Sequence, residues 1–175
     1  MKLKELIPLL TIVKTEGNPE VEITGIQMDS RKVRPGDLFI CIPGIPGLQE
    51  DRHLFAEEAV RAGAAALVTE REVGAGVPTL QVPDARYAMA VICAHYYSYP
   101  SHDLKLIGVT GTNGKTTVSH MIESILKHAG FRTGLMGNIG TKIGDTLLET
   151  DINTQEPPVL QANLTSKSEV QLHRL

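Results

Sequence analysis

The sequence lacks long hydrophobic runs and any excess of charge of one sign. No apolar run approaches the roughly 18 to 20 residues that cross a bilayer. The apolar part of the N-terminal MKLKELIPLL is too short for a signal peptide, and no small-residue cleavage site follows it. A net charge of −3 gives no reason to expect nucleic acid or an anionic membrane as a partner. These absences predict a soluble, cytoplasmic protein.

Cysteine and histidine are also sparse. The two cysteines, Cys41 and Cys93, stand in apolar surroundings, so we interpret them as buried free thiols of a reducing compartment. The six histidines are scattered, and neither residue type shows the paired spacing of a zinc site. His120 and His128 fall in a helical pattern, where a surface position is favoured over a catalytic one. No Cys/His metal centre is expected.

Alternating strand and helix patterns predict an α/β fold for a first domain, residues 1–101. Its β-rich runs are 21–29, 37–43, 64–70 and 77–83. A helical pattern begins at His53 and meets a stop signal at Gly63, and a second helix is expected from Ala85 after Asp84 as N-cap. The polar segment YSYPSHD, 97–103, is typical of a linker.

A second domain is predicted over residues 104–154. Its expected elements are a strand at 104–110, a helix reaching Gly130, a strand at 131–137 and a hairpin at 141–150 that turns near Gly144 and Asp145. From there to residue 175 the sequence is polar, so 155–175 is expected to be an irregular tail. The proline pair Pro157–Pro158 is expected to resist the start of a helix.

The segment TGTNGKTT, 110–117, has the composition of a phosphate-binding loop. Phosphate oxygens need several converging backbone N–H donors, and Gly111 and Gly114 leave room for that approach. Lys115 is placed to reach the β- and γ-phosphates, and the hydroxyl of Thr116 to ligate Mg²⁺. Val109 replaces the first glycine of the common pattern. The flanking strand and amphipathic helix still favour a nucleotide site over an ordinary strand–turn–helix corner.

Three stretches resemble the Mur ligases, which build the peptide of bacterial cell-wall precursors. TGTNGKTT after LIGV is similar to their ATP-binding signature, and DSRKVRPGDLF, 29–39, is similar to a segment of their N-terminal domain. The stretch TGLMGNIGTKIGD followed by ETDINT is most similar to the sequence of the members that make the UDP-N-acetylmuramoyl tripeptide. The resemblance covers residues 1 to about 154.

This resemblance implies a mixed α/β UDP-sugar-binding domain, followed by the start of a P-loop central domain. The implied reaction belongs to peptidoglycan synthesis and uses ATP and Mg²⁺. ATP phosphorylates the terminal carboxylate of UDP-N-acetylmuramoyl-L-Ala-D-Glu, and the amine of diaminopimelate or lysine then attacks the acyl phosphate. The chain is therefore expected to carry the N-terminal part of an ATP-dependent acid–amino-acid ligase.

The resemblance also implies site residues. The ATP contacts are Gly111, Thr112, Asn113, Gly114, Lys115, Thr116 and Thr117, with Thr116 on the metal. The UDP-muramoyl contacts are Ser30, Ile45, Pro46, Gly47, Asn153 and Thr154. Two alternatives stay open at this point. Ser30 could be a helix-cap or turn hydroxyl beside Asp29, and Arg31 could pair with the pyrophosphate or with Asp29 or Asp37.

The sequence departs from the family pattern in three places. Six residues separate Gly44 from Asp51, and Arg52 stands where glycine is usual, which costs about 1–2 kcal/mol if that position needs a positive φ. Gln155 replaces the second threonine of an N-T-T segment. After Thr150 no apolar strand ending in an acidic magnesium ligand can be drawn.

These departures predict a truncated ligase portion that is inactive by itself, and they leave other functions open. One alternative is a non-catalytic module that binds nucleotide or UDP-sugar. A stand-alone P-loop NTPase or kinase is disfavoured by the missing acidic strand. A separate polypeptide that completes the active site is compatible with the sequence.

Overall fold

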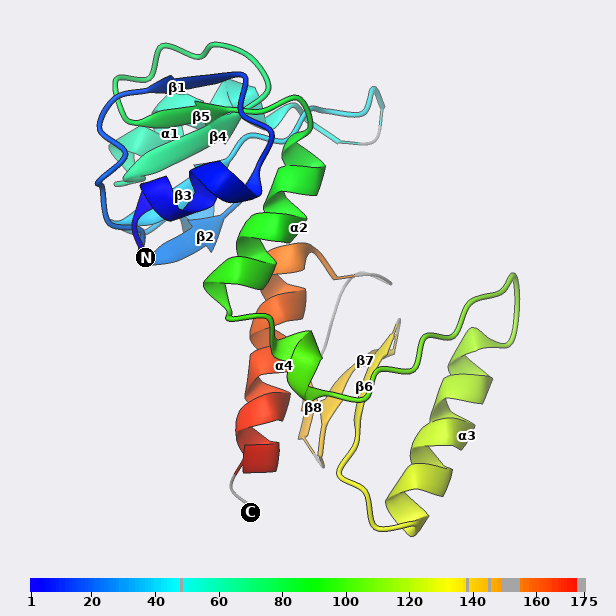
Figure 1. Cartoon of the computed structure of the whole chain (residues 1–175). Coiled ribbons are helices and arrows are strands. Elements are labelled where there is room, and N and C mark those ends of the chain that lie inside the picture. The colour runs from blue at the N-terminus through cyan, green and yellow to red at the C-terminus, as the bar shows by residue number, and fades with distance from the viewer. Residues whose placement is uncertain (48, 138, 145, 149–154, 173–175) are drawn as a thin grey trace. The chain divides into compact units, whose positions relative to one another are not determined.

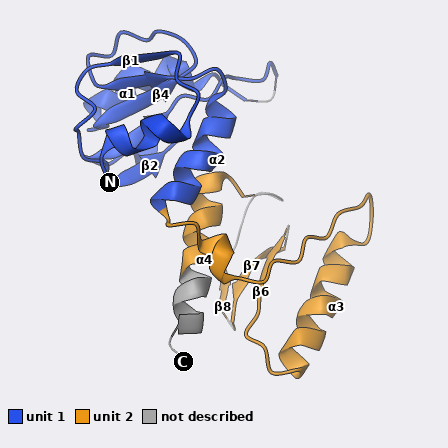
Figure 2. Ribbon diagram, in the orientation of Figure 1, with its two compact units in different colours: residues 1–96 blue, residues 97–175 orange. Residues whose placement is uncertain are grey.

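The computed structural model describes residues 1–47, 49–137, 139–144, 146–148 and 155–172 (Figure 1). The chain divides into two compact units, Met1–Tyr96 and Tyr97–Leu175 (Figure 2). Each unit contains its own β-sheet. Among the helices of the described ranges, none is long and apolar enough to cross a bilayer.

Unit 1 is built on a five-stranded sheet of order β1-β5-β4-β3-β2. The strands are β1 (Lys14–Glu16), β2 (Gly25–Gln27), β3 (Asp37–Ile40), β4 (Ala66–Thr69) and β5 (Thr79–Gln81). Neighbours from β2 to β5 are parallel, and β1 adds to β5 in the antiparallel sense. Each of the four predicted β-rich runs contains one strand, so the predicted α/β pattern is confirmed, with shorter strands than expected.

Both faces of this sheet are covered. The covering elements are the 3₁₀ helices η1 (Leu3–Leu9), η2 (Ser30–Lys32) and η3 (Arg52–Phe55) and the α-helices α1 (Ala56–Arg61) and α2 (Ala85–Tyr96). Leu38 and Ile40 of β3 pack in the cluster of η1 and α2, while Phe39 packs in the cluster of α1. Burial on both sides explains why residues 38–42 and 64–68, which contain most of β3 and β4, are continuous apolar runs rather than alternating ones.

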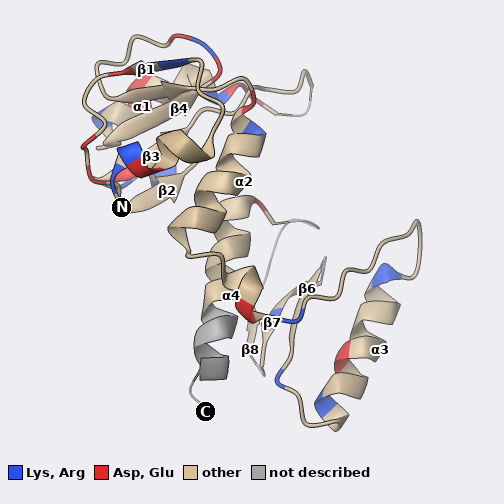
Figure 3. Ribbon diagram, viewed as in Figure 1, with Lys and Arg blue, Asp and Glu red and all other residues tan. Residues whose placement is uncertain are grey.

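The two predicted helix signals of unit 1 are confirmed. Gly63 follows α1 with φ +109°, a conformation that glycine adopts without steric cost. The Asp84 carboxylate accepts a 2.8 Å hydrogen bond from the Tyr87 N–H at the start of α2. The basic residues of α2 are Arg86 in its first turn and His95 in its last turn, and the helix contains no acidic residue (Figure 3). Its buried side includes Ile92 and Cys93.

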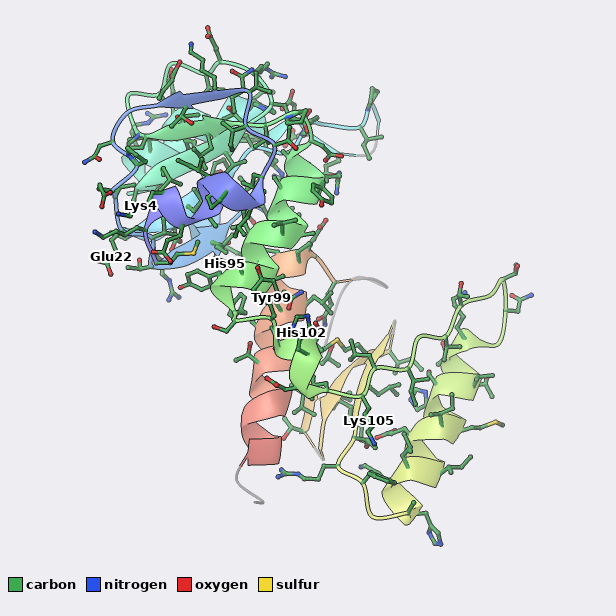
Figure 4. The ribbon with its side chains drawn as sticks, in the orientation of Figure 1. Lys4, Glu22, His95, Tyr99, His102 and Lys105 are labelled. Carbon is green, nitrogen blue, oxygen red and sulfur yellow. The ribbon has the colours of Figure 1, made fainter. Side chains whose placement is uncertain are left out.

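Unit 2 contains a three-stranded antiparallel sheet of order β6-β7-β8. Its elements are η4 (Pro100–Asp103), α3 (Lys115–His128), β6 (Gly134–Gly137), β7 (Gly140–Ile143), β8 (Thr146–Leu148) and α4 (Pro157–Leu172). The predicted strand at 131–137 and the predicted hairpin are confirmed, with Gly144 at φ +60° in the turn; Asp145 lies outside the described residues. At the start of η4 the ring of Tyr99 stacks on His102, with centroids 5.5 Å apart (Figure 4).

Two expectations for unit 2 are wrong. Residues 105–110 form no strand, and Leu106 and Ile107 are 61% and 59% exposed. A buried parallel strand needs neighbours on both sides, and the described part of the chain supplies none there. The irregular tail is also wrong for 157–172, which form α4. Proline at the first helical position is favoured because its missing N–H would have no partner there.

Candidate functional site

One edge of unit 1 contains four of the residues predicted to contact the sugar nucleotide, Ser30, Ile45, Pro46 and Gly47. The carboxyl ends of the parallel strands β2, β3 and β4 lie at this edge. The chain leaving β2 reaches Ser30, and the chain leaving β3 forms the loop that contains Ile45, Pro46 and Gly47. Open parallel sheets bind ligands outside the carboxyl ends of their strands. The fold therefore places both predicted segments at the carboxyl edge of the sheet.

Ser30 begins η2 and is largely buried, with 7% of its surface exposed. The capping role belongs to Asp29, whose carboxylate accepts a 3.2 Å hydrogen bond from the Arg31 N–H. The Ser30 hydroxyl makes no hydrogen bond to another described residue. The alternative interpretation of Ser30 as the capping hydroxyl is therefore not supported.

Arg31 pairs with Asp29. Its Nε and Nη2 donate to the two carboxylate oxygens at 2.8 Å each, which lowers the pKa of Asp29 to about 2. Asp29 in turn raises the pKa of Arg31, with smaller contributions from Glu58 and Glu50. Glu50 belongs to the loop after β3, so the charge of that loop contributes a little to the raised pKa of Arg31.

The loop after β3 is a small hairpin that projects from unit 1 (Figure 1). Ile45 and Gln49 exchange backbone hydrogen bonds of 2.8 and 2.9 Å, and Gly47 turns the chain with φ +74°. Gly44 at its base has no room for a side chain, because a Cβ there would lie 2.6 Å from the Asp51 nitrogen. The longer spacing between Gly44 and Asp51 is thus accommodated by a defined turn.

His53 fixes the end of this loop, a role that the sequence analysis missed. Its Nδ1 lies 2.6 Å from Asp51 Oδ1, and its Nε2 accepts a 2.9 Å hydrogen bond from the Glu70 N–H. Arg71 Nη2 lies 2.8 Å from the other oxygen of Asp51. Burial alone would raise the pKa of Asp51, but hydrogen bonds from His53 and Arg71 outweigh it and lower that pKa to about 2.

The strain considered for Arg52 is absent. Arg52 lies in η3, its N–H donates to the Ile42 carbonyl at 2.9 Å, and it is not among the residues with positive φ. The loop therefore accepts a side chain where the family usually has glycine.

The predicted phosphate loop of unit 2 has the backbone that its glycines suggested. Gly111 has φ +152° and Gly114 has φ +79°, and a Cβ on Gly114 would meet nothing within 4 Å. Lys115 is the first residue of α3, and its Nζ donates to the Gly111 and Thr112 carbonyls at 2.6 and 3.3 Å. The loop, including Asn113, is exposed. The lysine amine thus lies against the backbone carbonyls of an exposed turn that contains two glycines.

The start of α3 provides the remaining features of a phosphate site. The N–H groups of its first turn have no acceptor within the helix, and the helix dipole favours an anion there. The first helical bond runs from the Val118 N–H to the Gly114 carbonyl, at 2.9 Å. The Thr116 carbonyl accepts from Ser119 Oγ and lies 2.9 Å from His120 Nδ1, while Thr117 is exposed. These features are compatible with binding of the phosphates of a nucleoside triphosphate.

No described cluster of three or more His, Cys, Asp or Glu side chains could hold a metal ion. The predicted Mg²⁺ ligand is the hydroxyl of Thr116, and Mg²⁺ at nucleotide sites is also bound by phosphate oxygens. Asn153 and Thr154, the other predicted substrate contacts, lie outside the described residues. Gln155, next in the chain, donates to Thr141 Oγ1 and accepts from Asn163 at 2.9 Å, which ties α4 to β7.

The packing of α3 leaves part of its apolar face exposed. Its one buried residue is Glu123, with Oε1 3.1 Å from Lys142 Nζ on β7. Ile122 is half-buried, whereas Met121 and Ile125 are 60% and 67% exposed. The three-stranded sheet covers only one side of the helix.

Comparisons with known proteins agree with this architecture. Residues 22–97 match the model described as Mur ligase family, catalytic domain, and residues 109–173 match the Mur ligase middle domain. A UDP-N-acetylmuramoyl-L-alanyl-D-glutamate–2,6-diaminopimelate ligase of Listeria innocua is 46% identical over 161 residues, 92% of this chain and 32% of the relative. The ligase of the same name from Geobacillus thermodenitrificans is 48% identical over 163 residues, again 92% and 32%. A solved structure of a ligase with this name matches with TM-score 0.77 and 28% identity, over 97% of this chain and 34% of that chain.

The chain belongs to the Mur ligase family. The predicted family and fold class are both confirmed. The chain spans about a third of the length of the curated relatives that it matches.

Proposed function

We propose that the chain binds two substrates of a cell-wall precursor ligase. Unit 1 would bind UDP-N-acetylmuramoyl-L-Ala-D-Glu, and unit 2 the phosphates of ATP. Both substrates would be used to add the third amino acid to the peptide of the precursor. The names of the relatives favour diaminopimelate over lysine as that amino acid. The observation that carries this proposal is the turn of Gly111 and Gly114 with Lys115 at the head of α3, within a chain of this family.

Each residue of the phosphate loop has a definite role in this proposal. Bound ATP would supply the phosphoryl group that activates the glutamyl carboxylate. The Lys115 amine would exchange the Gly111 and Thr112 carbonyls for phosphate oxygens, which are stronger acceptors because they are charged. The backbone N–H groups from Thr112 to Thr117 would donate to the phosphates, and the Thr116 hydroxyl would hold Mg²⁺.

On the substrate side, Ser30 would donate its hydroxyl to the nucleotide sugar. Ile45, Pro46 and Gly47 would contact it from the projecting hairpin, and Asn153 and Thr154 would contact the muramoyl part. The hydrogen bond between His53 and Asp51 would hold the base of that hairpin in place. This reaction would take place in the cytoplasm, where ATP is available. The free thiols of Cys41 and Cys93 fit the same compartment, because it is reducing.

Hydrogen exchange followed by mass spectrometry tests both sites at once. The UDP-muramoyl dipeptide should slow exchange in 28–32 and 44–54, and Mg-ATP should slow it in 111–117. Lys115→Ala should remove the second protection and leave the first intact. Unchanged exchange in both regions with saturating ligands would contradict the proposal.

A second measurement separates a ligase from a binding module. ADP release that depends on the dipeptide substrate and diaminopimelate would show that the chain itself completes the reaction. Protection by both ligands without ADP release would support a module that binds nucleotide and sugar nucleotide without turnover.

A further inference from the structure

The carboxyl edge of the sheet in unit 1 carries several arginines, and one of them differs from the rest. Three are held by acceptors of the protein: Arg31 by Asp29, Arg71 by Asp51, and Arg86 by Gln49 at 2.5 Å. Arg52 is not. Its Nε is buried and finds no hydrogen-bond acceptor among the described residues, and no ion pair joins its guanidinium to any of them.

A buried guanidinium N–H without an acceptor is unfavourable, because the donor has lost water and gained nothing in return. Arginine stays charged at all physiological pH values, so loss of a proton cannot relieve this state. An incoming anion can relieve it, because the anion supplies the missing hydrogen-bond acceptor. The planar fork of a guanidinium matches the oxygens of a phosphate group and binds them through paired, charge-assisted hydrogen bonds.

The backbone of Arg52 is held in place beside the carboxyl end of β3. Its N–H is bonded to the Ile42 carbonyl just beyond β3. Its neighbours Asp51 and His53 are anchored to each other, and His53 to the end of β4 through Glu70. Arg52 therefore lies on a rigid support at the carboxyl edge of the sheet, the same edge to which β2 brings Ser30.

We infer that Arg52 binds the diphosphate of the nucleotide sugar and strengthens substrate binding at this edge. The inference rests on the proposed function, which supplies a ligand with a diphosphate. It concerns a residue that replaces the glycine usual at this position, so the contact is a property of this chain. Arg52 is a binding residue and takes no part in bond making.

The test compares UDP with uridine, which lacks the phosphates, by isothermal titration. Wild-type protein should bind UDP more tightly than uridine. Arg52→Ala should weaken UDP binding by roughly tenfold to 100-fold, the range expected for a charge-assisted hydrogen bond, and leave uridine binding unchanged. Arg61→Ala is the matched control, since Arg61 is an exposed arginine of α1 that donates only to the Glu57 carbonyl at 3.4 Å. It should bind UDP like the wild type.

In the titrations with UDP and uridine, two results overturn the inference: Arg52→Ala with the UDP affinity of the wild type, or a wild type that does not prefer UDP to uridine. If Arg52→Ala is poorly folded, Arg52→Gln retains most of the aliphatic stem and takes its place. Titration with the complete UDP-muramoyl dipeptide separates the two proposals. Equal binding by wild type and variant defeats the role of Arg52 alone, whereas no binding by the wild type defeats the proposed function as well.

Discussion

The imidazole of His53 donates from Nδ1 to the Asp51 carboxylate, 2.6 Å away, while its Nε2 accepts the Glu70 N–H. Because Nε2 accepts, the proton of the neutral ring lies on Nδ1. A single buried side chain thus joins the base of the projecting hairpin to the end of β4. The position of the candidate sugar-nucleotide loop depends on this pair.

Removal of the imidazole should therefore cost stability. His53→Ala leaves the Glu70 N–H without its acceptor and removes the imidazole donor to Asp51, so we expect a loss of about 1–3 kcal/mol in the free energy of unfolding. Urea denaturation measures it. His128→Ala, at the exposed end of α3, should change the free energy by less than about 0.5 kcal/mol. Equal values for the two variants would show that the contact contributes nothing.

The same carboxylate should make stability depend on pH. The pKa of Asp51 is lowered from 3.8 to about 2 in the folded protein, so its ionised form stabilises the fold above pH 3.8, and this contribution is lost as the pH falls toward 2. The difference in unfolding free energy between wild type and Asp51→Asn should be constant near neutral pH and should shrink across that acidic window. A difference that stays constant down to the lowest pH would contradict the assignment.

Two glycines of the hairpin should respond differently to alanine. Gly44→Ala places a Cβ 2.6 Å from the Asp51 nitrogen, and we expect about 1–3 kcal/mol of destabilisation from this clash and weaker binding of the UDP-muramoyl dipeptide. A Cβ on Gly47 would meet nothing within 4 Å, so Gly47→Ala should cost only the strain of its positive φ, about 1 kcal/mol in the free energy of unfolding. Thermal unfolding and titration of both variants check the order. A Gly47 variant that lost more binding than the Gly44 variant would reverse it.

The thiols of unit 1 should be unreactive while the protein is folded. Burial raises the pKa of Cys93 to about 12, and burial with a smaller effect of Asp51 raises the pKa of Cys41 to about 12. The thiolate is the reactive form, so Ellman's reagent at mildly alkaline pH should modify neither residue in the native protein and both in guanidinium chloride. Rapid modification of the native chain would contradict the described core.

Lys115 should matter for ATP and not for folding. Lys115→Ala should weaken ATP binding by about tenfold or more, because charge-assisted bonds to the phosphates are lost. Its urea midpoint should equal that of the wild type, since the side chain is exposed. Lys105→Ala, another exposed lysine of unit 2, is the control and should bind ATP normally. ATP affinity unaffected by Lys115→Ala would argue against a phosphate site.

The sequence predicted the parts of the fold that depend on local pattern. The buried runs at β3 and β4, the stop at Gly63 and the cap at Asp84 each carry their cause within a few residues. The phosphate loop was recognisable for the same reason, because Gly111, Gly114 and Lys115 stand within a few residues of one another. The structure adds that both glycines have a positive φ.

The features that the sequence did not reveal depend on partners far along the chain. His53 and Glu70 are 17 residues apart and meet only because β3 and β4 are adjacent. Residues 105–110 have the composition of a strand, but an apolar run forms one only where neighbouring strands are present to bond it. The start of α4 was missed because a proline pair was interpreted as a barrier rather than as a first turn.

Isothermal titration of the whole chain with UDP-N-acetylmuramoyl-L-Ala-D-Glu, with and without Mg-ATP, tests the central claim most directly. We predict saturable binding of the sugar nucleotide with one site per chain, and a separate site for Mg-ATP that Lys115→Ala removes. A well-folded protein that took up neither ligand would contradict the assignment of both sites.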